Sequence, residues 1–280
     1  MNNNKWWKIL CEAEDPELLS FIAIEIGAAG SELSQDSKVI IHFSGNQIEK
    51  EKFLFELKNS GALKIECFSE EDKNWVQMCK DVWEPIQVNK LRLVPILSHS
   101  DLQKENHCDL FIIPGNGFGT GHHESTRLAL KLLQSSEVAS GNIKSVLDVG
   151  TGNGILALAT ALLYRVKILA IDNDPLAVAN AKENIELNLN LKEYIQIQVG
   201  ELEETTNKSS MILANIYSHT LCNLQPIFHK VLEPNGLLIL SGIMLSQRED
   251  IESSFNGPKW SRLQIAQENN WIAYLLKCNH

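Results

Sequence analysis

The stretch "VLDVGTGNGILALA", Val146–Ala159, decides the fold. Its apolar start predicts a short buried strand, and the run of leucine and alanine at its end predicts a helix. Between them Gly150, Gly152 and Gly154 form a GxGxG turn, in which the absence of side chains lets backbone N–H groups approach a ligand closely. A dinucleotide fingerprint would read GxGxxG, but position 155 is isoleucine. The stretch therefore predicts a ligand-binding turn of another kind.

Two carboxylates beside this turn indicate the ligand. Asp148 lies two residues before the turn, where its charge disfavours a pyrophosphate and suits a ligand that carries an amino group. Asp172 ends the next expected strand, about 20 residues on, where a carboxylate accepts hydrogen bonds from ribose hydroxyls. An ordinary strand-to-helix turn is the alternative for the glycines alone. Together with both carboxylates they predict S-adenosylmethionine as the cofactor.

Strands and helices alternate after residue 88. Such alternation is typical of an α/β fold with a mostly parallel, doubly wound sheet, in which ligands bind at the carboxyl ends of the strands. Asp174 reads most simply as the N-cap of the following helix, and Glu201 either approaches the adenine or is a solvated loop acid. The expected strands are "KSVLDVG", "VKILAID", "YIQIQVG", "SMILANI" and "GLLILSG".

Asn215 ends the fourth of these strands and is the candidate catalytic residue. Its side-chain oxygen can accept a hydrogen bond from an amine, and a backbone carbonyl of Asn215 or Ile216 can accept another. Two acceptors would orient the nitrogen lone pair toward a sulfonium methyl group and so help an in-line displacement by positioning. The alternative is that Asn215 caps the next helix. Tyr217 is either an acceptor-pocket residue or an ordinary core or rim aromatic.

Three segments are expected along the chain. Residues 1–68 read as strand, helix, strand, strand, helix, strand, the order of a small ferredoxin-like α+β domain, with Asp15 starting a helix and Gly30 and Gly61 ending helices. Residues 69–85 are charged and predict an amphipathic linker helix that carries Trp75, Met78, Val82 and Trp83. Residues 86–280 form the expected methyltransferase domain.

Charge and composition exclude several classes of protein. A formal net charge of −10 disfavours direct nucleic-acid binding and favours a basic protein partner. The six cysteines lie apart without a CxxC pair, and no run resembles a signal peptide or a membrane span, so we expect a soluble, cytoplasmic protein with no membrane association. No metal site is expected, because the adjacent His122 and His123 do not naturally face one ion. A monomer is the default.

Four motifs together resemble the PrmA family, the ribosomal protein methyltransferases that act on large-subunit protein eleven: "PGNGFGTGHHESTRLAL", "VLDVGTGNGILALA", "AIDNDPLAV" and "LANIYSHTL". The resemblance covers most of residues 75–280. It implies transfer of methyl groups from S-adenosylmethionine to the N-terminal amine and lysine side chains of a basic large-subunit ribosomal protein, recognised by the N-terminal domain. It also implies that Thr126, Gly150, Asp172 and Asn215 bind the donor. For Thr126 the alternative is a helix cap.

The segment "PGNGFGTGHHEST", Pro114–Thr126, departs from the family at Ile113, where aspartate is common, and at Asn116 and Gly117. We expect it to fold over the methionine end of the donor, with Phe118 closing the site; a flexible turn is the alternative. Other readings of the chain are a related class I methyltransferase acting on another protein amine or amide or on a small molecule, a binding module without turnover, and a metal enzyme.

Overall fold

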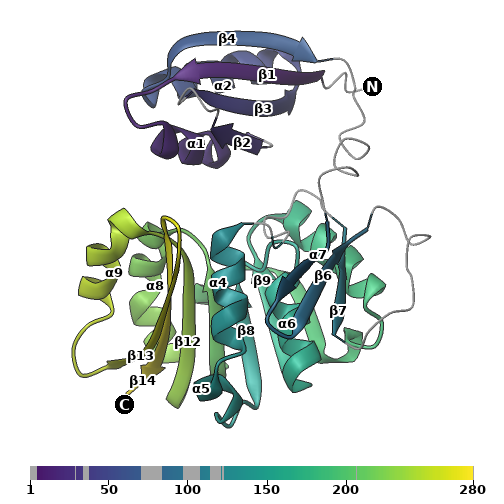
Figure 1. Cartoon of the computed structure of the whole chain (residues 1–280), viewed down its shortest axis with the longest axis vertical. Coiled ribbons are helices and arrows are strands. Elements are labelled where there is room, and N and C mark those ends of the chain that lie inside the picture. The colour runs from purple at the N-terminus through teal and green to yellow at the C-terminus, as the bar shows by residue number, and fades with distance from the viewer. Residues whose placement is uncertain are drawn as a thin grey trace. The chain divides into compact units, whose positions relative to one another are not determined.

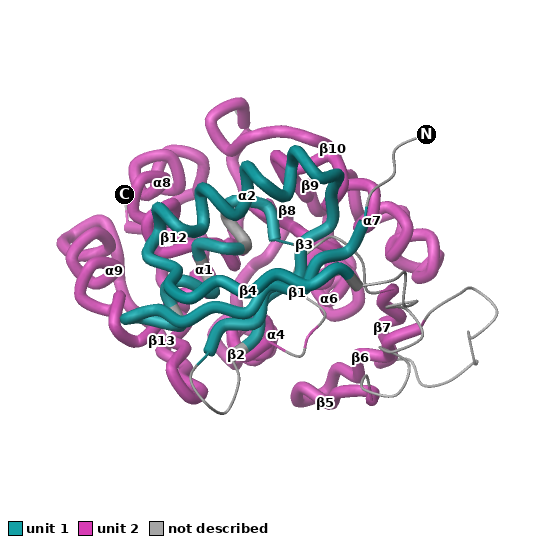
Figure 2. Tube along the Cα trace, turned by 90° about the horizontal axis from the view of Figure 1, so that it is seen from above, with its two compact units in different colours: residues 1–82 teal, residues 83–280 magenta. Residues whose placement is uncertain are grey.

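The computed structural model describes residues 5–28, 30–33, 38–70, 84–96, 108–113, 121, 123–205 and 207–279. The chain divides into two compact units, residues 1–82 and 83–280, which Figure 2 colours separately. Within the described residues, no helix combines the length and the apolar character that crossing a bilayer requires.

The first unit is a four-stranded antiparallel sheet with two helices. Its strands lie in the order β2-β3-β1-β4, and Ile9, Ile41 and Leu57 are fully buried in its core. This confirms the predicted ferredoxin-like order. The elements are β1 (Lys5–Glu12), α1 (Pro16–Glu25), β2 (Gly30–Leu33), β3 (Val39–Gly45), α2 (Gln47–Asn59) and β4 (Leu63–Glu70).

The helix ends of this unit follow the sequence signals with one exception. The Asp15 carboxylate accepts the N–H of Leu18 at 3.0 Å and so caps α1, and Gly61 follows α2 with φ of 100°. The left-handed residue after α1 is Gly27, with φ of 106°, whereas Gly30 begins β2. The prediction for Gly30 was therefore wrong. β4 runs to Glu70, and residues 71–83 of the expected linker helix lie outside the described part of the chain.

The second unit is built on a seven-stranded sheet in the order β10-β9-β8-β11-β12-β14-β13. Figure 1 labels β8, β9, β12, β13 and β14 of this sheet. The first five strands of this order are parallel to one another. The chain runs outward from β8 to β9 and β10 and then returns to β11 on the other side of β8, so the carboxyl ends of β8 and β11 form a topological switch point. These strands are β8 (Ser145–Val149), β9 (Lys167–Asp172), β10 (Ile195–Val199), β11 (Ser209–Asn215) and β12 (Leu232–Met244).

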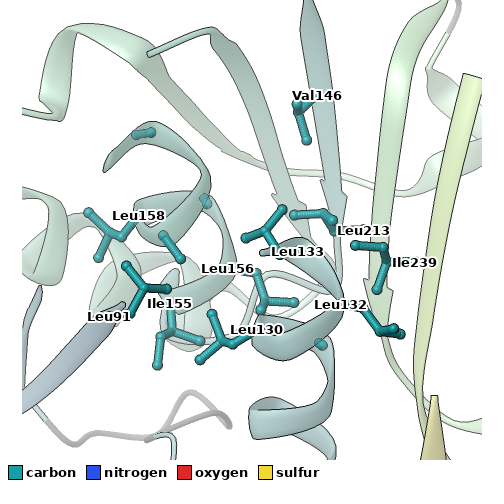
Figure 3. Packing of buried hydrophobic residues seen from close by; sticks show 14 of the residues in the cluster. Leu91, Leu130, Leu132, Leu133, Val146, Ile155, Leu156, Leu158, Leu213 and Ile239 are labelled. Carbon is teal, nitrogen blue, oxygen red and sulfur yellow. The ribbon is translucent and has the colours of Figure 1, made fainter. Parts of the chain in front are cut away.

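Strand β11 shows why the strands are continuous apolar runs. Met211 and Leu213 belong to one hydrophobic cluster and Ile212 and Ala214 to a second, because successive side chains point to opposite faces of a sheet that helices cover on both sides. In the first cluster, Leu156 lies near Leu133 and other side chains of the adjacent helix and strands (Figure 3). The class I, doubly wound fold is confirmed.

Helices connect the parallel strands, and a smaller sheet precedes them. Its strands β5 (Ile86–Val88), β6 (Leu91–Pro95) and β7 (Asp109–Ile112) lie in chain order, with β6 and β7 parallel. The described α-helices of this unit are α4 (Glu124–Leu133), α5 (Ser136–Ala139), α6 (Ile155–Tyr164), α7 (Pro175–Leu187), α8 (Ser218–Val231) and α9 (Arg248–Ser254).

The large sheet ends in an antiparallel pair that the sequence reading did not identify. β13 (Trp260–Glu268) and β14 (Trp271–Cys278) form a hairpin, and β14 pairs with β12 in the antiparallel direction. The hairpin completes the sheet on the side of α4, which packs against both of its strands.

Candidate functional site

The glycine turn lies where predicted, between β8 and α6. Gly150, Gly152 and Gly154 have φ of 66°, 57° and 84°, the left-handed region that other residues adopt only with strain. The backbone N–H of Thr151 donates to the carbonyl of Ile171 at 3.0 Å. The turn is therefore held against the end of β9, and its shape depends on glycine at all three positions.

Asp172 fastens this turn from the neighbouring strand. Its Oδ2 accepts the N–H of Gly152 at 2.8 Å, and its Oδ1 accepts the N–H of Asp174 at 3.0 Å. Each carboxylate oxygen has a second lone pair, so two acceptors remain for ribose hydroxyls. Asp174 caps α7 through Leu176 at 2.8 Å, as its sequence context predicts.

Asp148 is fully buried below the same turn. Its Oδ2 accepts the hydroxyl proton of Thr151 at 2.7 Å. Burial, assisted by the nearby negative charge of Asp172, raises the pKa of the Asp148 carboxyl to about 7, although the Thr151 hydrogen bond acts in the opposite direction. The carboxyl group thus fixes the turn from inside the protein, and its contact with a ligand amino group stays a prediction.

Asn215 at the end of β11 and Thr126 in the first turn of α4 contact each other. The Asn215 side-chain amide donates to the Thr126 hydroxyl at 3.3 Å, while the buried Asn215 Oδ1 has no hydrogen-bond partner within the described part of the chain. Neither residue is a helix cap, because Tyr217 occupies the N-cap of α8 and His123 that of α4. The alternatives of a cap at Asn215 and at Thr126 are therefore wrong.

Ile216 sets the distance between β11 and the glycine turn. A Cβ atom at Gly150 would come within 2.3 Å of Ile216 Cγ2, and a Cβ atom at Gly242, in β12, within 2.5 Å of the Ile216 carbonyl oxygen. Glycine on both sides lets the chain after Asn215 lie directly against the turn. The candidate site residues of β8, β9 and β11 are therefore gathered at one edge of the sheet.

The first turn of α4 is held by the strands next to it. The Ser241 hydroxyl donates to the carbonyl of Ser125 at 2.7 Å, and the ring of His123 meets that of Trp271 edge to face at 4.4 Å. Burial lowers the pKa of His123, which favours the neutral ring that accepts the Ser125 N–H at 3.2 Å. Thr126 thereby has a fixed position opposite Asn215.

An ion cluster holds the outer side of the same helix. Glu268, at the end of β13, receives Arg127 Nε at 2.8 Å and Lys131 Nζ at 2.5 Å. Because Arg127 and Lys131 are one turn apart, both reach the single carboxylate.

Sequence reasoning missed Ser125, Ser241 and Gly242, and it named Ile216 only for its backbone carbonyl, because the partners of these residues lie far along the chain. The glycine in "LSGI" was a usable signal for Gly242, since glycine inside a strand often marks a bulge or a close approach. Glu201 is exposed beyond β10. The predicted lid residue Phe118 and the glycines at 117 and 119 lie outside the described residues.

Two described cavities lie away from this edge. One of about 290 Å³ lies between α9 and the C-terminal hairpin, and one of about 550 Å³ opens at the amino ends of β8 and β11, near Lys144 and Ser210. In the described part of the chain, which includes His123 and not His122, no three His, Cys, Asp or Glu side chains gather to hold a metal ion.

Comparisons with known proteins point to one family. The family model described as "Ribosomal protein L11 methyltransferase (PrmA)" matches residues 8–279. A ribosomal protein L11 methyltransferase of Heliobacterium modesticaldum is 30% identical over 74% of this chain and 64% of its own length. One of Prochlorococcus marinus is 27% identical over 97% of both chains. The crystal structure of the L11 methylase of Lactobacillus delbrueckii subsp. bulgaricus superposes with a TM-score of 0.60 and 28% identity, over 71% of this chain and all of that one. The chain belongs to the ribosomal protein L11 methyltransferase (PrmA) family.

Proposed function

We propose that this protein transfers methyl groups from S-adenosylmethionine to amine nitrogens of ribosomal protein L11, at its N-terminal amine and lysine side chains. One observation carries the proposal: Asn215, fixed by Thr126 at 3.3 Å, lies beside a GxGxG turn and has a buried oxygen that accepts no hydrogen bond from the residues the structure describes. An unpaired buried acceptor is costly, and at this position a ligand N–H would supply the missing hydrogen bond.

The residues present fit S-adenosylmethionine. The turn at Gly150 and Gly152 leaves room for a ligand close to the backbone, and Asp172 retains lone pairs for the ribose hydroxyls. Asn215 Oδ1 can accept a hydrogen bond from an N–H group of the ligand, and the Thr126 hydroxyl keeps the Asn215 carboxamide in place. When bound, S-adenosylmethionine supplies a methyl group that is activated by the positive sulfonium beside it.

The chain's own contribution to the reaction is positioning. Asn215 would accept a hydrogen bond from the incoming amine and orient the lone pair of that amine toward the methyl group that S-adenosylmethionine would supply. The attacking amine must be neutral, and lysine has an ordinary pKa of about 10.4. Removal from water lowers that pKa, so the proton leaves to solvent and no general base of the protein is required.

Residues 1–68 are proposed to recognise L11, and residues 86–280 to carry out the chemistry. The net charge of −10 favours a basic partner, as ribosomal proteins are, and disfavours direct contact with RNA phosphates. We further propose that the enzyme acts in the cytoplasm, that it is a monomer and that it does not associate with a membrane.

Incubation of the enzyme with S-adenosylmethionine and total ribosomal proteins tests the proposal. Intact-mass analysis should show whole-methyl increments on L11 alone, and peptide mapping should place them on the N-terminal amine and lysines. Label on another protein, or on a small molecule, would support the related class I methyltransferase instead. Saturable calorimetric binding of NAD without binding of S-adenosylmethionine would contradict both.

A further inference from the structure

Three asparagines of α7 and its C-cap hold a strand from the side. Asn180, Asn184 and Asn188 are spaced four residues apart, and all are buried, with at most 7% of each exposed. Asn188 accepts the N–H of Phe111 at 3.1 Å and donates to its carbonyl at 2.8 Å. One side chain thus supplies both hydrogen bonds that a neighbouring strand would give to Phe111.

The same pattern repeats at Ile113, the residue directly after β7. Asn184 Oδ1 accepts the N–H of Ile113 at 2.7 Å, and Asn180 Nδ2 donates to its carbonyl at 3.3 Å. The spacing explains the match, because four helical residues rise about 6.0 Å and two strand residues about 6.6 Å. The asparagines therefore hold alternate residues of a chain that leads into the glycine-rich segment beginning at Pro114.

Asn184 differs from the other two in reaching the donor turn. Its Nδ2 donates to the carbonyl of Asn153 at 2.9 Å, and Asn153 lies between Gly152 and Gly154 and is itself fully buried. The orientation of the Asn184 carboxamide is unambiguous, since Ile113 N–H can only donate and Asn153 C=O can only accept. A single buried side chain thus joins the chain entering the segment at 114 to the GxGxG turn.

We infer that Asn184 is a positioning residue for the methyl donor: it fixes the GxGxG turn relative to Ile113 and thereby sets donor affinity. This inference rests on the proposed function, since it assigns the donor to that turn. Asn184 does not touch the reacting atoms. Its effect passes through the Asn153 carbonyl and the turn, which a purely structural asparagine would not influence.

Asn184→Ala and Asn188→Ala form a matched pair that tests it. Both variants remove a buried asparagine from the same side of α7 and its C-cap. Each loses hydrogen bonds to the backbone of Phe111 or Ile113, so both should have a lower Tm. Calorimetry should show the Kd for S-adenosylmethionine rising about tenfold or more for Asn184→Ala, because a buried carbonyl of the turn loses its partner, and staying within about twofold for Asn188→Ala. Equal Kd values for the two variants would overturn the inference.

Asn184→Asp separates the two bonds of Asn184. At a pH where the aspartate is ionised, one of its oxygens still accepts the Ile113 N–H, whereas the second oxygen has no proton to donate to the Asn153 carbonyl. The Kd for S-adenosylmethionine should rise by about as much as in Asn184→Ala. The kcat at saturating S-adenosylmethionine should change by a smaller factor than the Kd. A donor affinity equal to that of the wild-type protein would overturn the inference.

Hydrogen exchange of the wild-type protein keeps the test independent of variant folding. Adding S-adenosylmethionine should slow exchange of the Ile113 amide, held by Asn184, more than that of the Phe111 amide, held by Asn188. Equal slowing, or none, at the two amides contradicts the inference while the proposed function stands. Failure of the wild-type protein to bind the donor at all would contradict the proposed function itself.

Discussion

The carboxamide of Asn215 donates to the hydroxyl of Thr126 at 3.3 Å, although 89 residues separate them in the chain. This hydrogen bond joins the switch-point edge of the sheet to the first turn of α4. Both groups are therefore held in place before any ligand arrives, and the geometry that a positioning mechanism needs is built into the packing.

Asn215→Ala should reduce methyl transfer far more than donor binding. We expect kcat to fall about 10²-fold, since misplacement of an attacking group acts on the transition state, with only a few-fold rise in the Kd for S-adenosylmethionine. Single-turnover kinetics and calorimetry measure the two quantities. Thr126→Val keeps the shape of the side chain but removes the hydroxyl. It should lower kcat and raise the Kd by smaller factors than Asn215→Ala does. Equal factors in kcat and Kd would make Asn215 a donor contact only.

Gly150→Ala should destabilise the protein by more than backbone strain alone. A left-handed alanine costs about 1–2 kcal/mol, and at Gly150 its Cβ would also meet Ile216 Cγ2 at 2.3 Å. Gly257→Ala is the control, because Gly257 has φ of 85° with nothing within 4 Å of the new Cβ. Urea unfolding gives the two free energies, and adding Ile216→Ala should recover part of the loss at 150 only. An equal decrease in the free energy of unfolding for both variants would show that Ile216 can move away from the new Cβ atom at no cost.

Asp148→Asn should remove a pH dependence of stability. Burial raises the pKa of Asp148 from 3.8 to about 7, so between these values the folded protein binds more protons than the unfolded chain. The contribution of Asp148 to the free energy of unfolding is then fully present below pH 3.8 and is lost as the pH rises through about 7.

Urea unfolding of the variant and the wild-type protein from pH 4 to 8 measures this effect. The free-energy difference in favour of Asp148→Asn should grow with pH up to about 7, by at most about 1.4 kcal/mol per pH unit, and be constant above it. Parallel curves would mean that the buried carboxyl titrates normally.

Deletion of residues 1–68 should separate binding from recognition. The second unit, residues 83–280, has its own sheet and hydrophobic clusters, so the truncated enzyme should bind S-adenosylmethionine with unchanged Kd. Methylation of L11, followed by intact mass, should be lost. Normal L11 methylation by the truncated chain would contradict the recognition role of residues 1–68.

Local patterns account for what the sequence predicts correctly. The GxGxG turn and the carboxylates at 148 and 172 depend on residues within about one strand and one helix of each other, so spacing alone places them. The parallel strands can be recognised in the sequence as continuous apolar runs. In β11, for example, the side chains on both faces are buried.

Long-range partners account for what it misses. The family resemblance names Thr126, but its contact with Asn215 depends on the end of β11, and that of Asn184 depends on Ile113, 71 residues away. No local pattern distinguishes a threonine that binds Asn215 from one that caps a helix. The spacing of Asn180, Asn184 and Asn188 is a visible helical stripe, but only the position of β7 shows that it pairs a backbone.

The hairpin of β13 and β14 makes the position of Thr126 depend on residues far along the chain. Glu268 lies in β13 and Trp271 in β14, and both hold α4, which carries Thr126, although 141 residues separate Arg127 from Glu268. The first turn of α4 therefore lacks these supports until the hairpin has joined the sheet. A substitution that unpairs β13 from β14 would loosen Thr126 without touching the glycine turn.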